Sequence, residues 1–126
     1  MQARRVMVVD DEPFILRSLV YVLKKEGYDV TSAEDGNDAL VTIRQSKPEV
    51  LFLDVMMPKM DGFELCRIIK SDADLRDIYV ILLTAKGQAK DRECAVQAGA
   101  DEYITKPFRP SLVIEKVRSL LALKVG

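Results

Sequence analysis

The sequence predicts an α/β fold in which five strands alternate with five helices, (βα)5, and form one doubly wound five-stranded parallel sheet. Two observations predict this fold. Five short apolar runs recur along the chain, and the segments between them carry apolar residues at the spacing of amphipathic helices. Three of the runs are apolar at every position, as in central parallel strands with both faces buried. The length suits one domain, so we expect residues 1–126 to form a single domain.

The expected strands follow the apolar runs in chain order. Residues 6–9, 50–53 and 79–83 are the fully apolar runs, and we expect them to be central strands. Residues 29–33 alternate more and residues 102–104 form a short run, so both are expected at the edges of the sheet. Parallel strands joined by helices require right-handed crossovers, and helices on both faces cover the sheet.

Helices are expected between these strands. Gly27 suits the end of the first, Asp35 lies near the start of the second, Asp61 can cap the third, and Pro110 suits the first turn of the fifth. The fourth, residues 88–98, has an inward face of small residues and is expected to be the most mobile. The apolar positions at helical spacing in the other four are Leu16, Leu19, Val20 and Leu23, then Ala39, Leu40 and Ile43, then Phe63, Cys66 and Ile69, and finally Val113, Val117, Leu120 and Leu121.

The composition excludes several classes of function. Nineteen basic and 20 acidic residues give a net charge of −1, which excludes a broad basic surface for nucleic acid. The chain has no histidine, which excludes Ser-His-Asp and Cys-His catalysis and every histidine metal site. Cys66 and Cys94 are too few for a disulfide framework, and we expect both to be reduced, buried and inert in a cytoplasmic protein. No run approaches the roughly 18 apolar residues of a membrane span, so we expect no membrane partner.

Polar residues lie where the expected strands end. Asp10 and Asp11 follow the first apolar run, Asp54 the third and Thr84 the fourth, and Lys106 comes shortly after the fifth. Ligands of an open parallel sheet bind at the carboxyl ends of its strands. If the three buried strands are neighbours, the three aspartates therefore converge at one edge. Each residue alone suits an ordinary turn or helix cap, and only the combination indicates a site.

A cluster of three carboxylates restricts the chemistry. Two carboxylates about 4 Å apart repel by roughly 4 kcal/mol at an effective dielectric constant of about 20, so the cluster must raise a pKa or bind a cation. Oxygen ligands without His or Cys favour a hard ion, and a few carboxylates with room for water suit Mg²⁺. A nearby lysine is suited to pair with a phosphoryl group, and an aspartate can be the nucleophile that forms an aspartyl-phosphate.

Four segments, in order, resemble the response regulator receiver (CheY-like) domain of two-component signal transduction. They are DDEP at 10–13, LDVMMPKMDG at 53–62, LTA at 83–85 and GADEYITKPF at 99–108. The resemblance covers essentially the whole chain, and it implies a flavodoxin-like strand order, 2-1-3-4-5.

The resemblance also implies the chemistry of the acidic residues. Asp54 matches the phosphoacceptor. Asp11 matches the direct ligand of Mg²⁺, and Asp10 matches an acidic neighbour that acts largely through metal-bound water. Asp54 and the backbone carbonyl of Met56 complete the implied metal ligands, so Mg²⁺ is the expected cofactor.

The resemblance also implies roles for Lys106, Thr84 and Tyr103, the last two as the switch residues. Lys106 matches the lysine that pairs with the phosphoryl group and acts with Asp54 and Thr84 in the reaction. Thr84 matches the switch hydroxyl, and Tyr103 matches the aromatic residue that changes rotamer. The bond between Lys106 and Pro107 resembles a cis peptide of the family. Phosphorylation is expected to change the outer face of the fourth helix, fifth strand and fifth helix.

These features predict a phosphorylation-activated signalling switch. Asp54 would accept a phosphoryl group, in a Mg-dependent reaction, from the phosphohistidine of a sensor histidine kinase or a phosphotransfer protein, because this chain has no histidine of its own. We expect no enzyme acting on a separate substrate; the chain would promote only its own phosphorylation and dephosphorylation. No direct nucleic-acid binding is expected of this segment, which is either a stand-alone regulator or one domain of a longer one.

Other readings stay open from the sequence. A homodimer through the outer face is open because Asp101, Glu115 and Arg118 lie near positions that pair across dimers in the winged-helix regulators that the chain resembles. A phosphatase would normally carry a second carboxylate where this chain has Met56. A flavin or nucleotide binder would carry a GxGxxG or P-loop motif, which is absent. A receiver-like domain used only for interactions would not need the three aspartates, Thr84 and Lys106, all of which are present. Met56 and Lys86 flank the site and are expected to tune the phosphoryl lifetime.

Overall fold

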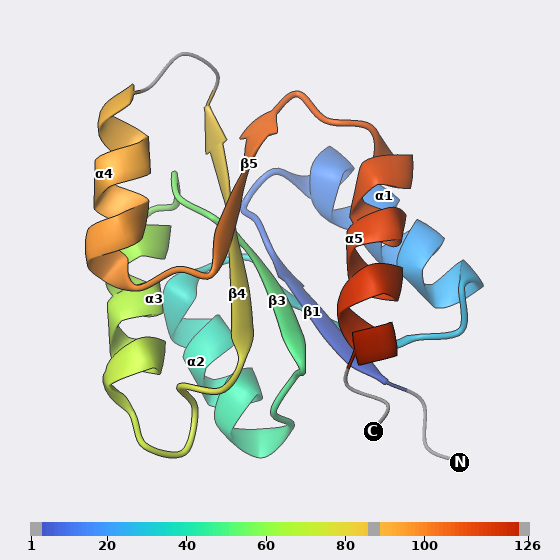
Figure 1. Ribbon diagram of the computed structural model, residues 1–126, viewed down its shortest axis with the longest axis horizontal. Coiled ribbons are helices and arrows are strands. Elements are labelled where there is room, and N and C mark those ends of the chain that lie inside the picture. The colour runs from blue at the N-terminus through green and yellow to red at the C-terminus, as the bar shows by residue number, and fades with distance from the viewer. Residues whose placement is uncertain (1–3, 86–88, 124–126) are drawn as a thin grey trace.

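The computed structural model of the chain describes residues 4–85 and 89–123. Within these residues, strands and helices alternate in the predicted order (Figure 1). The strands are β1 (Arg5–Val9), β2 (Asp29–Ala33), β3 (Val50–Asp54), β4 (Tyr79–Ala85) and β5 (Glu102–Lys106). The helices are α1 (Pro13–Lys25), α2 (Gly36–Gln45), α3 (Gly62–Ser71), α4 (Ala89–Ala98) and α5 (Pro110–Leu123). The predicted α/β class is confirmed.

The strands form one parallel sheet in the order β2-β1-β3-β4-β5, which confirms the flavodoxin-like order. β1, β3 and β4 lie in the interior, and β2 and β5 lie at the edges, as predicted. Helices α1 and α5 cover one face, and α2, α3 and α4 cover the other (Figure 1). None of the helices in the described ranges has the length and apolar character needed to cross a bilayer.

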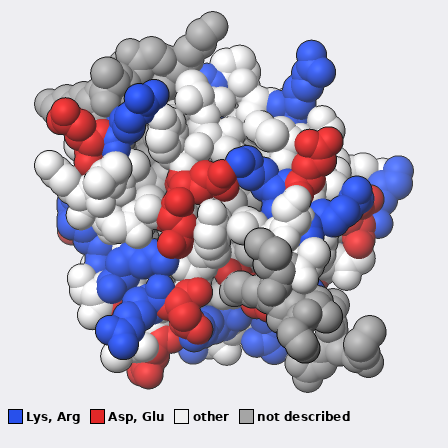
Figure 2. Space-filling view, viewed as in Figure 1, with Lys and Arg blue, Asp and Glu red and all other residues white. Residues whose placement is uncertain are grey.

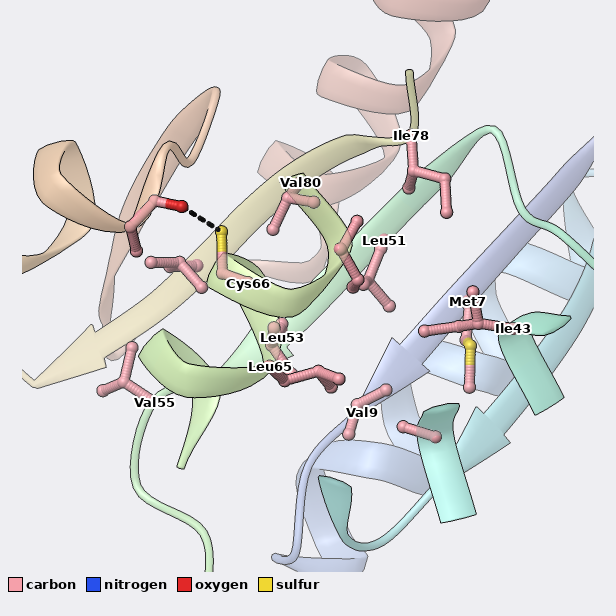
Figure 3. Packing of buried hydrophobic residues seen from close by; sticks show 14 of the residues in the cluster. Met7, Val9, Ile43, Leu51, Leu53, Val55, Leu65, Cys66, Ile78 and Val80 are labelled. Carbon is pink, nitrogen blue, oxygen red and sulfur yellow. Dashed lines mark hydrogen bonds between the residues drawn. The ribbon is translucent and has the colours of Figure 1, made fainter. Parts of the chain in front are cut away.

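Alternation along the central strands gives each face its own apolar core, because successive side chains of a strand point to opposite faces. Figure 3 shows the core under α2 and α3, where Met7, Leu51 and Val80 of three strands lie with Ile43 of α2 and Leu65 of α3. All five side chains are fully buried. Since burying one such side chain contributes about 1.5–3 kcal/mol, these layers supply the main driving force for folding.

The predicted helix ends have the expected capping geometry. A carboxylate oxygen of Asp35 accepts a hydrogen bond from the amide of Asp38 at 2.8 Å, and Asp61 accepts one from Glu64 at 2.9 Å. Each cap satisfies an amide that the helix leaves unpaired and contributes about 1 kcal/mol. Gly27, just after α1, has a φ of 92°, the left-handed conformation that favours glycine.

Three strands extend further than predicted. Asp54 is the last residue of β3, Thr84 belongs to β4, and Lys106 is the last residue of β5. The reason is that the parallel ladders continue beyond the predicted ends. β3 pairs with β4 through Asp54 and Leu83. β4 pairs with β5 through Thr84 with Thr105 and Ala85 with Lys106. These site residues are therefore held by strand hydrogen bonding, not by loops as the predicted boundaries implied.

Helix α4 buries little apolar surface, as predicted. Among its described side chains, Ala95 and Ala98 are buried and Cys94 is half-buried. The prediction that both cysteines are buried is therefore wrong for Cys94, because it lies on this weakly packed helix. Gln88, the predicted first residue of the helix, lies outside the described residues. The greater mobility of α4 stays a prediction.

The amino-terminal ends of β4 and β5 are fixed by Lys70 of α3. Its Nζ donates to the carbonyl oxygen of Ile78 at 2.6 Å and to the carboxylate of Asp101 at 2.7 Å. Nearby, the Cys66 thiol donates to the carbonyl oxygen of Ala98 at 3.5 Å, and burial raises the pKa of Cys66 to about 11. These contacts join α3 to the carboxyl-terminal end of α4 and to the start of β5.

Gly62 allows the loop after β3 to fold back against the strand. A Cβ at this position would lie 2.3 Å from the carbonyl oxygen of Asp54 and 2.8 Å from the Cα of Val55. The Gly62 amide donates to the Val55 carbonyl at 3.2 Å, which holds this approach. Because the neighbours are backbone atoms, they can make room only by moving Asp54.

We expect Gly62→Ala to lower the free energy of unfolding by about 3 kcal/mol, because the added methyl overpacks a rigid site. Gly27→Ala is the matched reference: a Cβ there meets nothing within 4 Å, so only its positive φ should cost, at about 1 kcal/mol. Denaturant unfolding of both variants measures the difference. A loss for Gly62→Ala no larger than that for Gly27→Ala would contradict the proposed clash.

Candidate functional site

Three carboxylates meet at the carboxyl edge of the sheet. Asp10, Asp11 and Asp54 each offer one oxygen, and these oxygens lie within 4.8 Å of one another. The strand register causes this, since β1 pairs with β3 through Val9 and Leu53, the residues just before Asp10 and Asp54. Asp10 is fully buried and Asp54 is only 4% exposed, whereas Asp11 faces solvent.

Local hydrogen bonds orient the two buried carboxylates. Asp10 Oδ1 accepts from the amide of Glu12 at 2.9 Å, and the Asp10 amide donates to the carbonyl oxygen of Ala33 at 3.2 Å. Asp54 Oδ1 accepts from the amide of Met56 at 3.2 Å. The chain therefore fixes both carboxylates from the loops that follow β1 and β3.

Lys106 supplies positive charge to the cluster. Its Nζ lies 2.9 Å from Asp10 Oδ2 and 3.3 Å from Asp54 Oδ1. Because Lys106 ends β5, its side chain must extend past the ends of β4 and β3 to reach Asp10. The structure thus brings Lys106 next to Asp10, which lies 96 positions earlier in the sequence.

The electrostatics of the cluster leave it short of positive charge. Burial raises the pKa of Asp54 to about 6, and the negative charge of Asp10 adds to the rise, while Lys106 and the Met56 amide act against it. Burial acts to lower the pKa of Lys106, but its hydrogen bond to Asp10 and the charge of Asp54 outweigh this, so its pKa is raised. One ammonium cannot neutralise three carboxylates.

The donor set fits a hard divalent ion. It consists of carboxylate oxygens that are close enough to share one ion, and one of them is exposed to water. A carboxylate whose pKa is raised by burial and by a like charge gains from a nearby cation. The described residues therefore suit Mg²⁺ in the site at Asp10, Asp11 and Asp54.

The structure places the remaining predicted residues, Thr84 and Tyr103, on the neighbouring strands β4 and β5. Thr84 is 2% exposed, and it directly follows Leu83, which pairs with Asp54 across the sheet. Tyr103 is half-buried, and its hydroxyl accepts a hydrogen bond from Arg92 at the surface. The bond between Lys106 and Pro107 is cis, which confirms that prediction.

Of the two residues expected to flank the site, Met56 has a side chain that is 71% exposed beside the cluster. Lys86 lies outside the described residues.

A cavity of about 690 Å³ opens beside the cluster. Asp54 and Lys106 lie on its wall with apolar side chains such as Phe14, Ile15 and Phe108. The sequence analysis did not identify this apolar wall. The one hint in the sequence was Phe14, a large apolar residue outside the apolar spacing of α1, and in the structure its side chain is 75% exposed.

The profile of the response regulator receiver domain matches residues 6–118. The chain belongs to the response regulator receiver family. The predicted family and its place in two-component signalling are confirmed. A receiver domain is a signalling domain.

Relatives of the receiver domain support this assignment. The chain is 36% identical over 118 residues to the DNA-binding response regulator MtrA of Mycolicibacterium smegmatis. The match covers 94% of this chain and 50% of MtrA. The chain therefore spans about half the length of that relative.

Solved structures show the same fold. The signal receiver domain of a signal transduction histidine kinase from Syntrophus aciditrophicus is 35% identical, with a TM-score of 0.88, covering 95% of this chain and 91% of that one. The chemotaxis response regulator CheY4 of Vibrio cholerae is 26% identical, with a TM-score of 0.86, covering 94% of this chain and 98% of that one.

We expect Asp54→Asn to raise the free energy of unfolding of the metal-free receiver domain by about 3 kcal/mol near pH 8. The native carboxyl has a pKa of about 6 against 3.8 for an ordinary aspartate, so its ionisation costs native stability as the pH rises between these values. Below both values the carboxyl is protonated in either state, and the gain should vanish. Urea unfolding at several pH values measures it.

Added Mg²⁺ is the control, because a cation should remove the same penalty from the wild-type protein. We therefore expect Mg²⁺ near pH 8 to stabilise the wild type more than Asp54→Asn. A variant that is less stable than the wild type near pH 8 without metal would show that ionised Asp54 is not a strained group.

Proposed function

We propose that Asp54 is the phosphoacceptor of this receiver domain and takes its phosphoryl group from a phosphohistidine. The observation that carries the proposal is the position of Asp54, buried between Asp10 and Lys106 yet lining an open cavity. Such a carboxylate can be reached from outside while its surroundings are ready to hold a phosphoryl group. With a pKa of about 6, Asp54 is mostly ionised at neutral pH.

Asp10, Asp11, Asp54 and the backbone carbonyl of Met56 would hold Mg²⁺, with Asp10 acting mainly through water. The ion supplies charge neutralisation for the transferring phosphoryl group. This assignment is supported by the oxygen-only donor set and by the excess of negative charge around Asp54.

In the transfer, a carboxylate oxygen of Asp54 forms a bond to phosphorus. The bond from phosphorus to the donor imidazole nitrogen breaks, and its electron pair stays on that nitrogen. Lys106, now 3.3 Å from Asp54, would pair with the phosphoryl oxygens, because an ammonium is a strong partner for phosphate. Asp54 and Lys106 are therefore the proposed reacting and charge-stabilising groups.

The donor would approach through the cavity next to Asp54. Its apolar wall, which includes Phe14 and Phe108, suits the ring of a histidine and the surface of a protein carrying it. The position two residues beyond Asp54 is Met56, which offers no second carboxylate as a general acid for a separate substrate. This favours a phosphoacceptor that promotes only its own phosphorylation and dephosphorylation.

Phosphorylation would add a charge of about −1.5 to −2 at Asp54. The hydroxyl of Thr84 lies at the end of the neighbouring strand and would donate to the new phosphoryl oxygens. Tyr103 would then move toward Thr84, and the face of α4, β5 and α5 would change. The output is thus a shift between two populated states.

The same face is the proposed surface of a homodimer. Figure 2 shows acidic and basic side chains mixed over this side of the molecule. Asp101 and Arg118, two candidates for pairing between subunits, instead pair within the chain, with Lys70 and Glu26. A homodimer using them would have to exchange these pairs, which sizing with and without beryllofluoride, a phosphoryl analogue, would test.

We expect acetyl phosphate with Mg²⁺ to place one acid-labile phosphoryl group on the wild-type chain and none on Asp54→Asn. Asp61→Asn is the matched control, because Asp61 caps α3 at the surface and asparagine also caps helices. Mass spectrometry of the intact chains measures the label. Labelling that persists in Asp54→Asn would show that another residue accepts the phosphoryl group.

A further inference from the structure

Arg92 of α4 contacts the proposed switch residue Tyr103 in two ways. Its Nε donates to the Tyr103 hydroxyl at 2.7 Å, and its guanidinium carbon lies 5.8 Å from the centre of the ring. The first is a hydrogen bond from a charged donor, and the second lies within the range of a cation–π interaction. Both contacts hold the hydroxyl end of Tyr103 at the surface, since Arg92 is exposed.

The register of the sheet shows what these contacts oppose. Tyr103 of β5 pairs with Leu82 of β4, and Thr105 pairs with Thr84. Tyr103 packs on the same apolar core as Leu82, so its ring lies on the face of the sheet that also carries Thr84, two residues further along β4. Neighbouring strands lie about 4.8 Å apart and two residues of a parallel strand span about 6.6 Å, so this diagonal is about 8 Å, within reach of an aromatic ring. Motion of the ring toward Thr84 must break the bond to Arg92.

The rest of α4 offers little resistance to such a motion. Its carboxyl-terminal end is held through Ala98, whose carbonyl oxygen accepts from Cys66. In the part of the helix whose side chains are described, the Arg92 contact is the one side-chain hydrogen bond to β5. A cavity of about 320 Å³ between α4 and β5, lined by Val96 and Tyr103, leaves space beside the ring.

We infer that Arg92 is a positioning residue that holds Tyr103 outward and thereby stabilises the unphosphorylated state of this domain. This inference rests on the proposed function, because it assigns the regulation of the same switch. A ligand that favours the inward state must overcome the Arg92 contact, so its apparent affinity is its intrinsic affinity multiplied by the fraction of molecules in which Tyr103 is already inward. Removing the guanidinium should shift the population inward before any phosphorylation.

The test uses the full chain with Mg²⁺ and beryllofluoride. We expect Arg92→Ala to bind beryllofluoride about three- to tenfold more tightly, the effect of losing one hydrogen bond of ordinary strength from the competing state. Arg67→Ala is the matched control, since Arg67 is an exposed arginine on α3, away from β5. Its affinity should equal that of the wild type.

A double-mutant cycle isolates the contact. Tyr103→Phe removes the hydroxyl that accepts from Arg92, so Arg92→Ala should change the beryllofluoride affinity less than twofold in that background. An equal gain in both backgrounds would show that Arg92 acts through something other than the Tyr103 hydroxyl, which overturns the inference.

A readout in the metal-free protein completes the test. In protein labelled with 3-fluorotyrosine, the Tyr103 resonance is the one of four that Tyr103→Phe removes. Arg92→Ala should move this fluorine resonance toward its position in beryllofluoride-bound wild type, whereas a purely structural role would leave it in place.

If wild type itself binds no beryllofluoride, the proposed function fails. If wild type binds it but Arg92→Ala and Arg67→Ala behave alike, only the role of Arg92 fails.

Discussion

The structure depends on the balance of charge between Lys106 and the buried carboxylates of Asp10 and Asp54. A fully buried carboxylate is tolerated only when it is hydrogen-bonded and paired, and Asp10 receives both the Glu12 amide and the Lys106 ammonium. Asp54 shares the same ammonium at a longer distance, and burial, together with the charge of Asp10, raises its pKa despite that ammonium. The site therefore gains from further positive charge, and in the proposed function this gain would couple the metal, the phosphoryl group and the conformation of the domain.

The strand order of the sheet places these charged residues side by side. β2 lies on one side of β1, and the chain then crosses back so that β3 lies on the other side. The two buried aspartates therefore lie at the ends of adjacent strands. The apolar layers on both faces hold the strands in one register, and Gly62 lets the following loop return close to Asp54. Stability and function thus share the same backbone atoms.

The fold and the acidic cluster could be predicted from the sequence because their signals are local. Fully apolar runs mark the buried strands, and an aspartate after such a run lies at a known edge of the sheet. The apolar wall around Phe14 could not be predicted in this way, because it forms from helices and loops that meet only in space. The Arg92 contact with Tyr103 was equally hidden, since α4 has too weak an apolar stripe to set its rotation. Strand ends were predicted too early because the ladder between β4 and β5 continues through polar residues.

The hydrogen bonds of Lys70 to Ile78 and Asp101 affect how α4 is held. It anchors the start of β5 to α3, and the Cys66 contact anchors the far end of α4 beside it. In the part of α4 whose side chains are described, Arg92 donates the side-chain hydrogen bond that ties the helix to β5. In the proposed switch, loss of that bond would leave α4 free to turn about its carboxyl-terminal end, where Ala98 is held. The proposed output would then be a change in the angle between the amino-terminal half of α4 and the sheet.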